Sequence, residues 1–171
     1  MKINDLLISQ LQASITTLRL CIEQCPDDTW NEKVGNAPIS IAAFHALFFA
    51  DIYLERSLDT FKDQPYHKEN AALFGDYEEL ESEMQQRQYE KADILNYLHF
   101  CQSKAATVIS AETDETLAEV SGFPWIKGPR AEVHVYNARH VQHHAAQISL
   151  RLRLNLQTDI PWVKQGLEVA N

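Results

Sequence analysis

Cysteine, glycine and proline are all scarce in this chain, and each scarcity argues against a class of protein. The three cysteines, Cys21, Cys25 and Cys101, show no tight metal-binding spacing, so we expect free thiols in a reducing compartment rather than a disulfide framework. Only five glycines and six prolines punctuate 171 residues, whereas Ala, Leu, Gln and Glu are abundant. That composition favours helices over sheets, and the length favours a single domain with a sizeable core.

The sequence also lacks a basic cluster and a long apolar run. A net charge of −9 without a clustered basic face argues against a nucleic-acid partner, because phosphate binding requires concentrated Lys and Arg. The most apolar segment, residues 39–54, contains His45 and Asp51 and is shorter than the roughly 18 apolar residues of a membrane span. The N-terminal segment has no continuous apolar stretch of the kind that a signal peptide needs. We therefore expect a cytoplasmic protein with no membrane partner.

The spacing of apolar residues predicts an all-α fold, a four-helix bundle with long connecting loops. The expected long helices are residues 3–24, 40–61, 91–110 and 131–156. Ser40 is a good N-cap for the second helix, whose first half is apolar nearly all round and therefore central in the bundle. Residues 1–171 form one domain.

The segments between and after these helices also permit structural predictions. A short polar helix is expected to begin at Asp76, with Glu79 in its capping box, and to end before a break near residues 89–91. A loop of about twenty residues precedes the last helix, and Phe123 and Trp125 are available to pack it. Residues 155–171 form a tail that we expect to fold back through Trp162.

The last predicted helix carries two histidines on its apolar face. At about 100° per residue, His140 and His144 fall about 20° to either side of Val133. Burial of two adjacent imidazoles is costly, because each has two ring nitrogens to satisfy and protonation of both would place like charges together. Their i, i+4 spacing lets both rings converge on one divalent cation, which removes both costs. The alternative is a pair of surface or singly hydrogen-bonded histidines.

A metal site needs a third ligand, and His45 is the best candidate. It lies in the middle of the most apolar helix, beside Phe44, Phe48 and Ile52, where a structural core histidine is the alternative interpretation. Three histidines leave at least one coordination position open, which is typical of catalytic rather than structural metal sites. The absence of Asp or Glu at metal-ligand spacing from the histidine pair argues against a di-iron carboxylate bundle.

We expect other roles for the remaining histidines. His143 lies at the edge of the apolar stripe, where it is exposed or supports the ligands from outside. His99 could face the core in a structural role, and His67, in a polar loop, is expected to be solvated. No general base is identifiable, although Asp51, Tyr136 and His143 lie within reach by spacing.

The segments that carry these histidines resemble the DinB-like (DinB/YfiT) family. "NARHVQHHAAQI" resembles the family's closing signature, His-x3-His followed by Gln and an aliphatic residue, and "SIAAFHALFFADIYLERSL" resembles its second helix. The resemblance covers the chain up to residue 156. It implies an up-down-down-up bundle, a homodimer and a divalent metal ion, typically nickel or zinc, held by His45, His140 and His144. The common "HHRGQ" form reads "HHAAQ" here, which keeps the ligands but lacks the Arg and Gly.

Three functions stay open. The resemblance implies a metalloenzyme, because characterised members include thiol-dependent S-transferases and a thiol-dependent isomerase; the metal would activate a low-molecular-weight thiol or, in a hydrolase, a water. A second possibility is a metal-dependent ligand-binding or stress-response module without turnover. A third is a helical dimer whose metal is adventitious. The sequence names neither the small-molecule substrate nor the metal.

Overall fold

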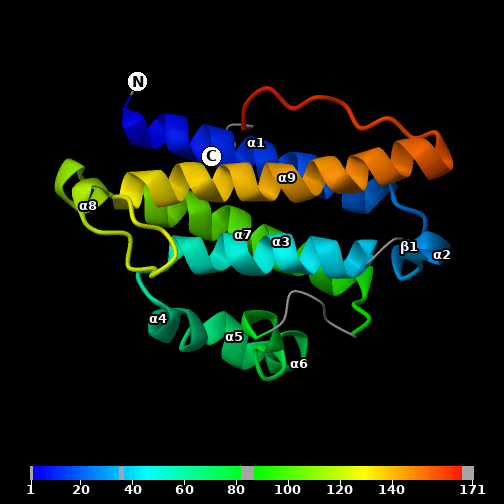
Figure 1. Ribbon diagram of the computed structural model, residues 1–171, viewed down its shortest axis with the longest axis horizontal. Coiled ribbons are helices and arrows are strands. Elements are labelled where there is room, and N and C mark those ends of the chain that lie inside the picture. Colours follow the sequence, from blue (N-terminus) through cyan, green and yellow to red (C-terminus); the bar gives the residue numbers. More distant parts are fainter. Residues whose placement is uncertain (1, 35–36, 82–86, 167–171) are drawn as a thin grey trace.

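Four long helices form the body of the computed structural model, which describes residues 2–34, 37–81 and 87–166. The fold is all-α, as predicted, and its long helices are α1 (Ile3–Gln24), α3 (Ile39–Leu54), α7 (Lys91–Ser110) and α9 (Arg130–Leu156). Both α1 and α3 pack against α7 and α9. In Figure 1, α1 and α9 run in one direction and α3 and α7 in the other, so the connection from α3 to α7 crosses the length of the bundle. The middle of α3 therefore lies against the middle of α9.

Short elements make the connections. Between α1 and α3 lie α2 (Asp27–Trp30) and the strands β1 (Lys33–Val34) and β2 (Ala37–Pro38), which pair antiparallel. The crossover from α3 to α7 contains α4 (Leu58–Lys62), α5 (Pro65–Glu69), α6 (Ala71–Phe74) and a 3-10 turn, η1 (Glu78–Leu80). Another short helix, α8 (Asp114–Ala118), precedes α9.

The hydrophobic core lies between the four long helices, and α3 is its most buried member. Leu47, Phe48 and Ile52 of α3 are fully buried, as is Leu98 of α7 facing them from the same cluster. Burial of a side chain of this size contributes roughly 1.5–3 kcal/mol. An apolar pattern nearly all round α3 predicted this central position, since a helix with no polar face has no side to present to water.

The predicted helix over residues 40–61 is wrong at both ends. It begins at Ile39, after Pro38, so Ser40 is not the N-cap; its Oγ is buried without a hydrogen-bond partner. It ends at Leu54, because the buried Arg130 guanidinium donates to the carbonyl oxygens of Tyr53, Leu54 and Glu55 at 2.7–2.9 Å. These carbonyls have no partner within the helix, and the guanidinium supplies one from α9.

The crossover also departs from the prediction. Where a polar helix from Asp76 was predicted, the described residues up to Glu81 contain the 3-10 turn η1, and Glu79 does not form a capping box; its side chain is buried against α3. The later part of that predicted helix, residues 82–86, lies outside the described residues. The predicted break near residues 89–91 is confirmed, because α7 begins at Lys91.

The segment after α9 folds back along α1, as expected (Figure 1). Gly166 donates its backbone N–H to the Ser9 carbonyl at 2.9 Å, and a Cβ at residue 166 would lie 2.6 Å from the Gln12 Cβ, so a larger residue would not fit. Trp162 does not anchor this contact, because 73 % of it is exposed. Residues 167–171 of the predicted tail lie outside the described residues.

The predicted free thiols are confirmed: Cys21, Cys25 and Cys101 are unpaired and buried. In the segment before α9, Phe123 is buried, whereas Trp125 is 47 % exposed. None of the helices in residues 2–34, 37–81 and 87–166 combines the length and apolar character needed to cross a membrane.

Candidate metal centre

The three predicted metal ligands meet where α3 crosses α9. His45 projects from the middle of α3, and His140 and His144 project from successive turns of α9. One ligand atom from each of the three residues lies within 4.8 Å of the other two. The ring centroids are 4.6–5.4 Å apart. The antiparallel packing of two helices thus brings together residues far apart in the sequence.

The Nε2 atoms are the nitrogens available to a metal ion. Those of His140 and His144 lie 3.2 Å apart, whereas the Nδ1 atom of His45 is engaged elsewhere, which leaves its Nε2 free. Two imidazole nitrogens bound to one tetrahedral zinc ion at about 2.1 Å would be about 3.4 Å apart. The observed separation therefore fits a shared divalent cation, and neutral imidazole is a preferred donor for nickel and zinc.

Burial keeps the two α9 histidines neutral. It lowers the pKa of His140 to about 3, helped by the charges that protonated His144 and His45 would carry. Burial likewise lowers the pKa of His144 to about 4, with His45 and His143 as further contributors. Near neutral pH both rings therefore carry a free lone pair, which is the form that binds metal.

Glu79 fixes the orientation of His45, and sequence reasoning missed it. Its Oε1 lies 2.5 Å from the Nδ1 of His45, and its side chain is 1 % exposed. A carboxylate on Nδ1 holds the proton there and turns Nε2 toward the ligand cluster, an arrangement found behind many metal-binding histidines. The two residues are 34 positions apart in the sequence, with the end of α3 and much of the crossover between them, so no periodic signal predicted this contact.

Gln147 orients His144 in the way that Glu79 orients His45. Its Oε1 accepts from the His144 Nδ1 at 3.0 Å, and its amide nitrogen donates to His143 Nε2 at 3.0 Å. Both hydrogen bonds run along one face of α9. His143 is exposed and does not join the three-histidine cluster, in line with its predicted place at the edge of the stripe.

The expectation that His67 is solvated is wrong, and the same contacts occupy Asp51. His67 is not solvated: it is 1 % exposed, and its Nε2 lies 2.8 Å from Asp51 Oδ2. Asp51 also accepts from Tyr97 and from Lys104, so it is committed to this cluster and is no general base for the histidine site. Burial alone would raise the pKa of Asp51, but His67 and Lys104 hold that pKa below its ordinary value. The crossover turns His67 inward, which its polar sequence context did not reveal.

His134 belongs to a second buried cluster, and His99 is exposed. The Nε2 of His134 lies 3.3 Å from Glu112 Oε1, which also accepts from Arg130. Burial, then the Arg130 charge, lowers the pKa of His134 to about 4. Burial opposes ionisation of Glu112, but hydrogen bonds from Thr116, Arg130 and His134 lower its pKa to about 2. This cluster is a neutral imidazole beside an ion pair rather than a metal site.

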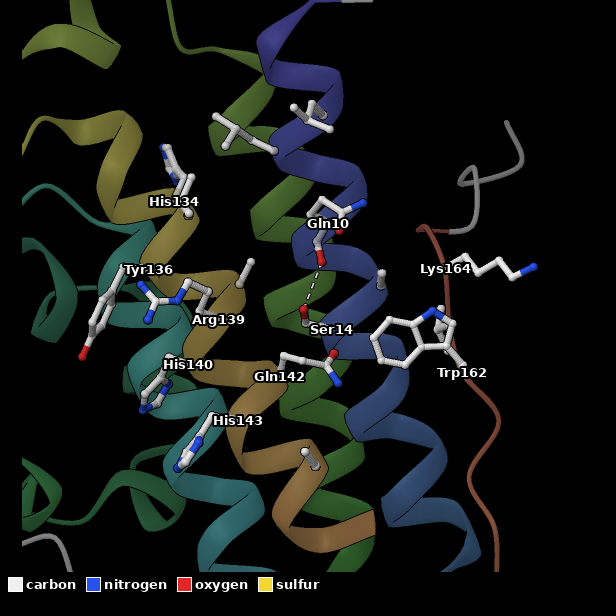
Figure 2. Close-up of a pocket in the computed structure, with 17 residues that line it drawn as sticks. Gln10, Ser14, His134, Tyr136, Arg139, His140, Gln142, His143, Trp162 and Lys164 are labelled. Atoms are coloured by element: carbon white, nitrogen blue, oxygen red, sulfur yellow. Dashed lines mark hydrogen bonds between the residues drawn. The ribbon is translucent and has the colours of Figure 1, made fainter. Parts of the chain in front are cut away.

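A groove of about 800 Å³ lies between α1, α9 and the segment after α9, and His140 is among the residues that line it. Figure 2 shows Tyr136, His140 and His143 on one side of this groove and Trp162 and Lys164 on the other. His140 is half-buried and is the member of the three-histidine cluster that lines this groove.

Comparison with known proteins adds a family match. The family model described as the DinB superfamily matches residues 10–148, which include His45, His140 and His144. Neither the curated proteins nor the solved structures gave a match.

Proposed function

The chain belongs to the DinB superfamily, and we propose that it is a metalloenzyme whose divalent cation, nickel or zinc, is bound by His45, His140 and His144. The observation that carries the proposal is the convergence of three imidazoles, two of them held neutral, at one half-buried point. Glu79 and Gln147 support the proposal. Each accepts a hydrogen bond from the Nδ1–H of a histidine, His45 and His144 respectively, which leaves the Nε2 atom of that ring for the ion.

We propose thiol-dependent S-transfer as the reaction. A divalent cation with three protein ligands keeps open positions, and when bound it lowers the pKa of a coordinated thiol toward neutrality. In the transfer, the thiol sulfur forms a bond to an electrophilic carbon of the substrate. The leaving group departs with its electron pair, and the thiol proton passes to solvent.

The thiol comes from outside the chain. Burial raises the pKa of Cys21 to about 12, raises that of Cys25, and raises that of Cys101 well above its ordinary value. None of the three residues belongs to the histidine cluster. The chain's own cysteines are therefore buried thiols rather than thiolates, so a low-molecular-weight thiol is the source of the sulfur in this proposal.

The test is turnover by protein purified without a His-tag and reconstituted with nickel or zinc. We expect one ion per chain and conversion of an electrophile only when thiol and metal are both present. Turnover without thiol would favour a metal-dependent hydrolase, and bound metal without turnover a ligand-binding module. Protein that retains no stoichiometric metal would contradict the proposal.

A further inference from the structure

Aromatic rings border the histidine cluster on one side. Phe49 lies 4.8 Å from His45 and 5.6 Å from His140, measured between ring centroids. Tyr136 stacks on His140, with centroids 6.3 Å apart and planes inclined by 15°. The histidine cluster is therefore bordered by aromatic rings from both α3 and α9.

Four more contacts extend this border to the segment before α9. Tyr53 meets Tyr136 edge to face at 5.2 Å and Phe123 at 5.5 Å, and the Trp125 indole N–H donates to the Tyr53 hydroxyl at 3.2 Å. Phe123 and Trp125 are themselves 5.5 Å apart. We call this set the aromatic strip: Phe49, Tyr53, Phe123, Trp125 and Tyr136.

Two members of the aromatic strip remain open to solvent. Trp125 is 47 % exposed and Tyr136 is 37 % exposed, although Tyr53 and Phe123 beside them are buried. A single exposed aromatic residue is ordinary on a protein surface. Here both exposed rings are fixed by contacts to buried ones, and Tyr136 also lines the groove that reaches His140 (Figure 2). The aromatic strip is thus a partly exposed surface whose exposed rings pack on buried ones, and it begins beside His140.

We propose that the substrate of this metal centre carries an aromatic ring, which lies against Trp125 and Tyr136 while its polar head group reaches the open metal position. The proposal rests on the proposed function, since it needs an ion at His45, His140 and His144. Aromatic side chains favour offset-stacked and edge-to-face partners, so the strip selects a flat ring over an aliphatic group of similar size.

The test uses three hydroxamic acids as metal-binding probes: acetohydroxamate, cyclohexanecarbohydroxamate and benzohydroxamate. All three probes present the same hydroxamate group to the ion. A difference in their affinities therefore reports how the residues around the ion contact the attached group. Their binding to the cobalt-loaded protein is followed by the visible spectrum of the ion. We expect benzohydroxamate to bind about tenfold more tightly than either other probe.

Substitutions in the aromatic strip test where the phenyl ring of benzohydroxamate binds. Trp125→Ala and Tyr136→Ala should each remove most of the benzohydroxamate preference while leaving acetohydroxamate affinity and cobalt content unchanged. Trp162→Ala is the matched control, because Trp162 is an exposed tryptophan on the other side of the groove. It should behave as the unsubstituted protein does.

Equal affinity for the three probes would overturn the aromatic proposal while leaving the metal centre intact. So would a preference that survives both strip variants, or one that disappears only with Trp162→Ala. Failure to bind cobalt at all would instead refute the proposed function, so the two failures are distinguishable.

Discussion

At the scale of single residues, the three clustered histidines differ in what contacts the Nδ1 atom of the ring. His45 has Glu79 on Nδ1, His144 has Gln147, and the Nδ1 of His140 is buried without a partner. Position on an apolar stripe sufficed to predict His140 and His144 from the sequence. Glu79 could not be predicted, because its contact depends on how the crossover folds and not on any local spacing.

Loss of one α9 ligand should remove the metal without unfolding the protein. His140→Ala and His144→Ala should each abolish stoichiometric nickel or zinc, because two ligands rarely hold such an ion. Plasma mass spectrometry after dialysis measures the metal, and circular dichroism checks the fold. His143→Ala is the control and should keep its metal, since the His143 ring lies outside the cluster. Equal loss in the control would place the site elsewhere on α9.

Removal of the charge on Glu79 should weaken the metal site rather than destroy it. For Glu79→Gln we expect a 10- to 100-fold loss of affinity, the usual effect of losing a carboxylate behind a metal-binding histidine. Competition with a chromogenic chelator measures the affinity. Glu81→Gln, at an exposed position two residues away, should leave it unchanged. An unaltered affinity in the Glu79 variant would show that Glu79 does not orient His45.

The buried His134 should make stability depend on pH. Its folded-state pKa, about 4, lies below the ordinary value of about 6.5, so between these values the unfolded chain binds a proton that the folded chain does not. The free energy of unfolding should therefore fall as pH falls from about 6.5 to about 4, by at most about 3 kcal/mol from this residue. His134→Gln keeps a donor toward Glu112 and should show a shallower fall in urea unfolding. A variant that follows the same curve as the parent would contradict the assignment.

At the scale of elements, apolar periodicity predicted α1 and the start and end of α7 and α9 to within a residue or so. It failed in the crossover, where short polar segments take their structure from tertiary contacts. The end of α3 at Leu54 depends on Arg130, and the burial of His67 depends on Asp51; both partners are distant in sequence. Local pattern carries no information about such pairs.

The buried cluster of Asp51, His67 and Lys104 should contribute much of the free energy that holds the crossover against the bundle. Asp51→Ala would leave His67 and Lys104 without their buried carboxylate, a change that typically costs 3–5 kcal/mol of unfolding free energy. Urea unfolding measures the loss. Asp63→Ala, which removes an exposed pair with Lys68, should change stability little. Comparable losses in the two variants would mean that the buried cluster contributes no more than a surface ion pair.

At the scale of the whole molecule, the bundle brings the three histidines together through the antiparallel packing of α3 on α9. Family membership and the all-α fold follow from the sequence and the structure together. The homodimer implied by the family resemblance stays a prediction, as do the identities of the metal and the thiol. What the fold contributes is a half-buried cluster of three imidazoles, two of them kept neutral by burial, with a carboxylate on His45 and aromatic rings along one side.

The most direct measurement is anomalous diffraction from crystals of the untagged protein loaded with nickel or zinc. We predict one strong anomalous peak per chain, about 2.1 Å from the Nε2 atoms of His45, His140 and His144. A peak bound by other residues, or a His45 ring turned away from the ion, would contradict the account.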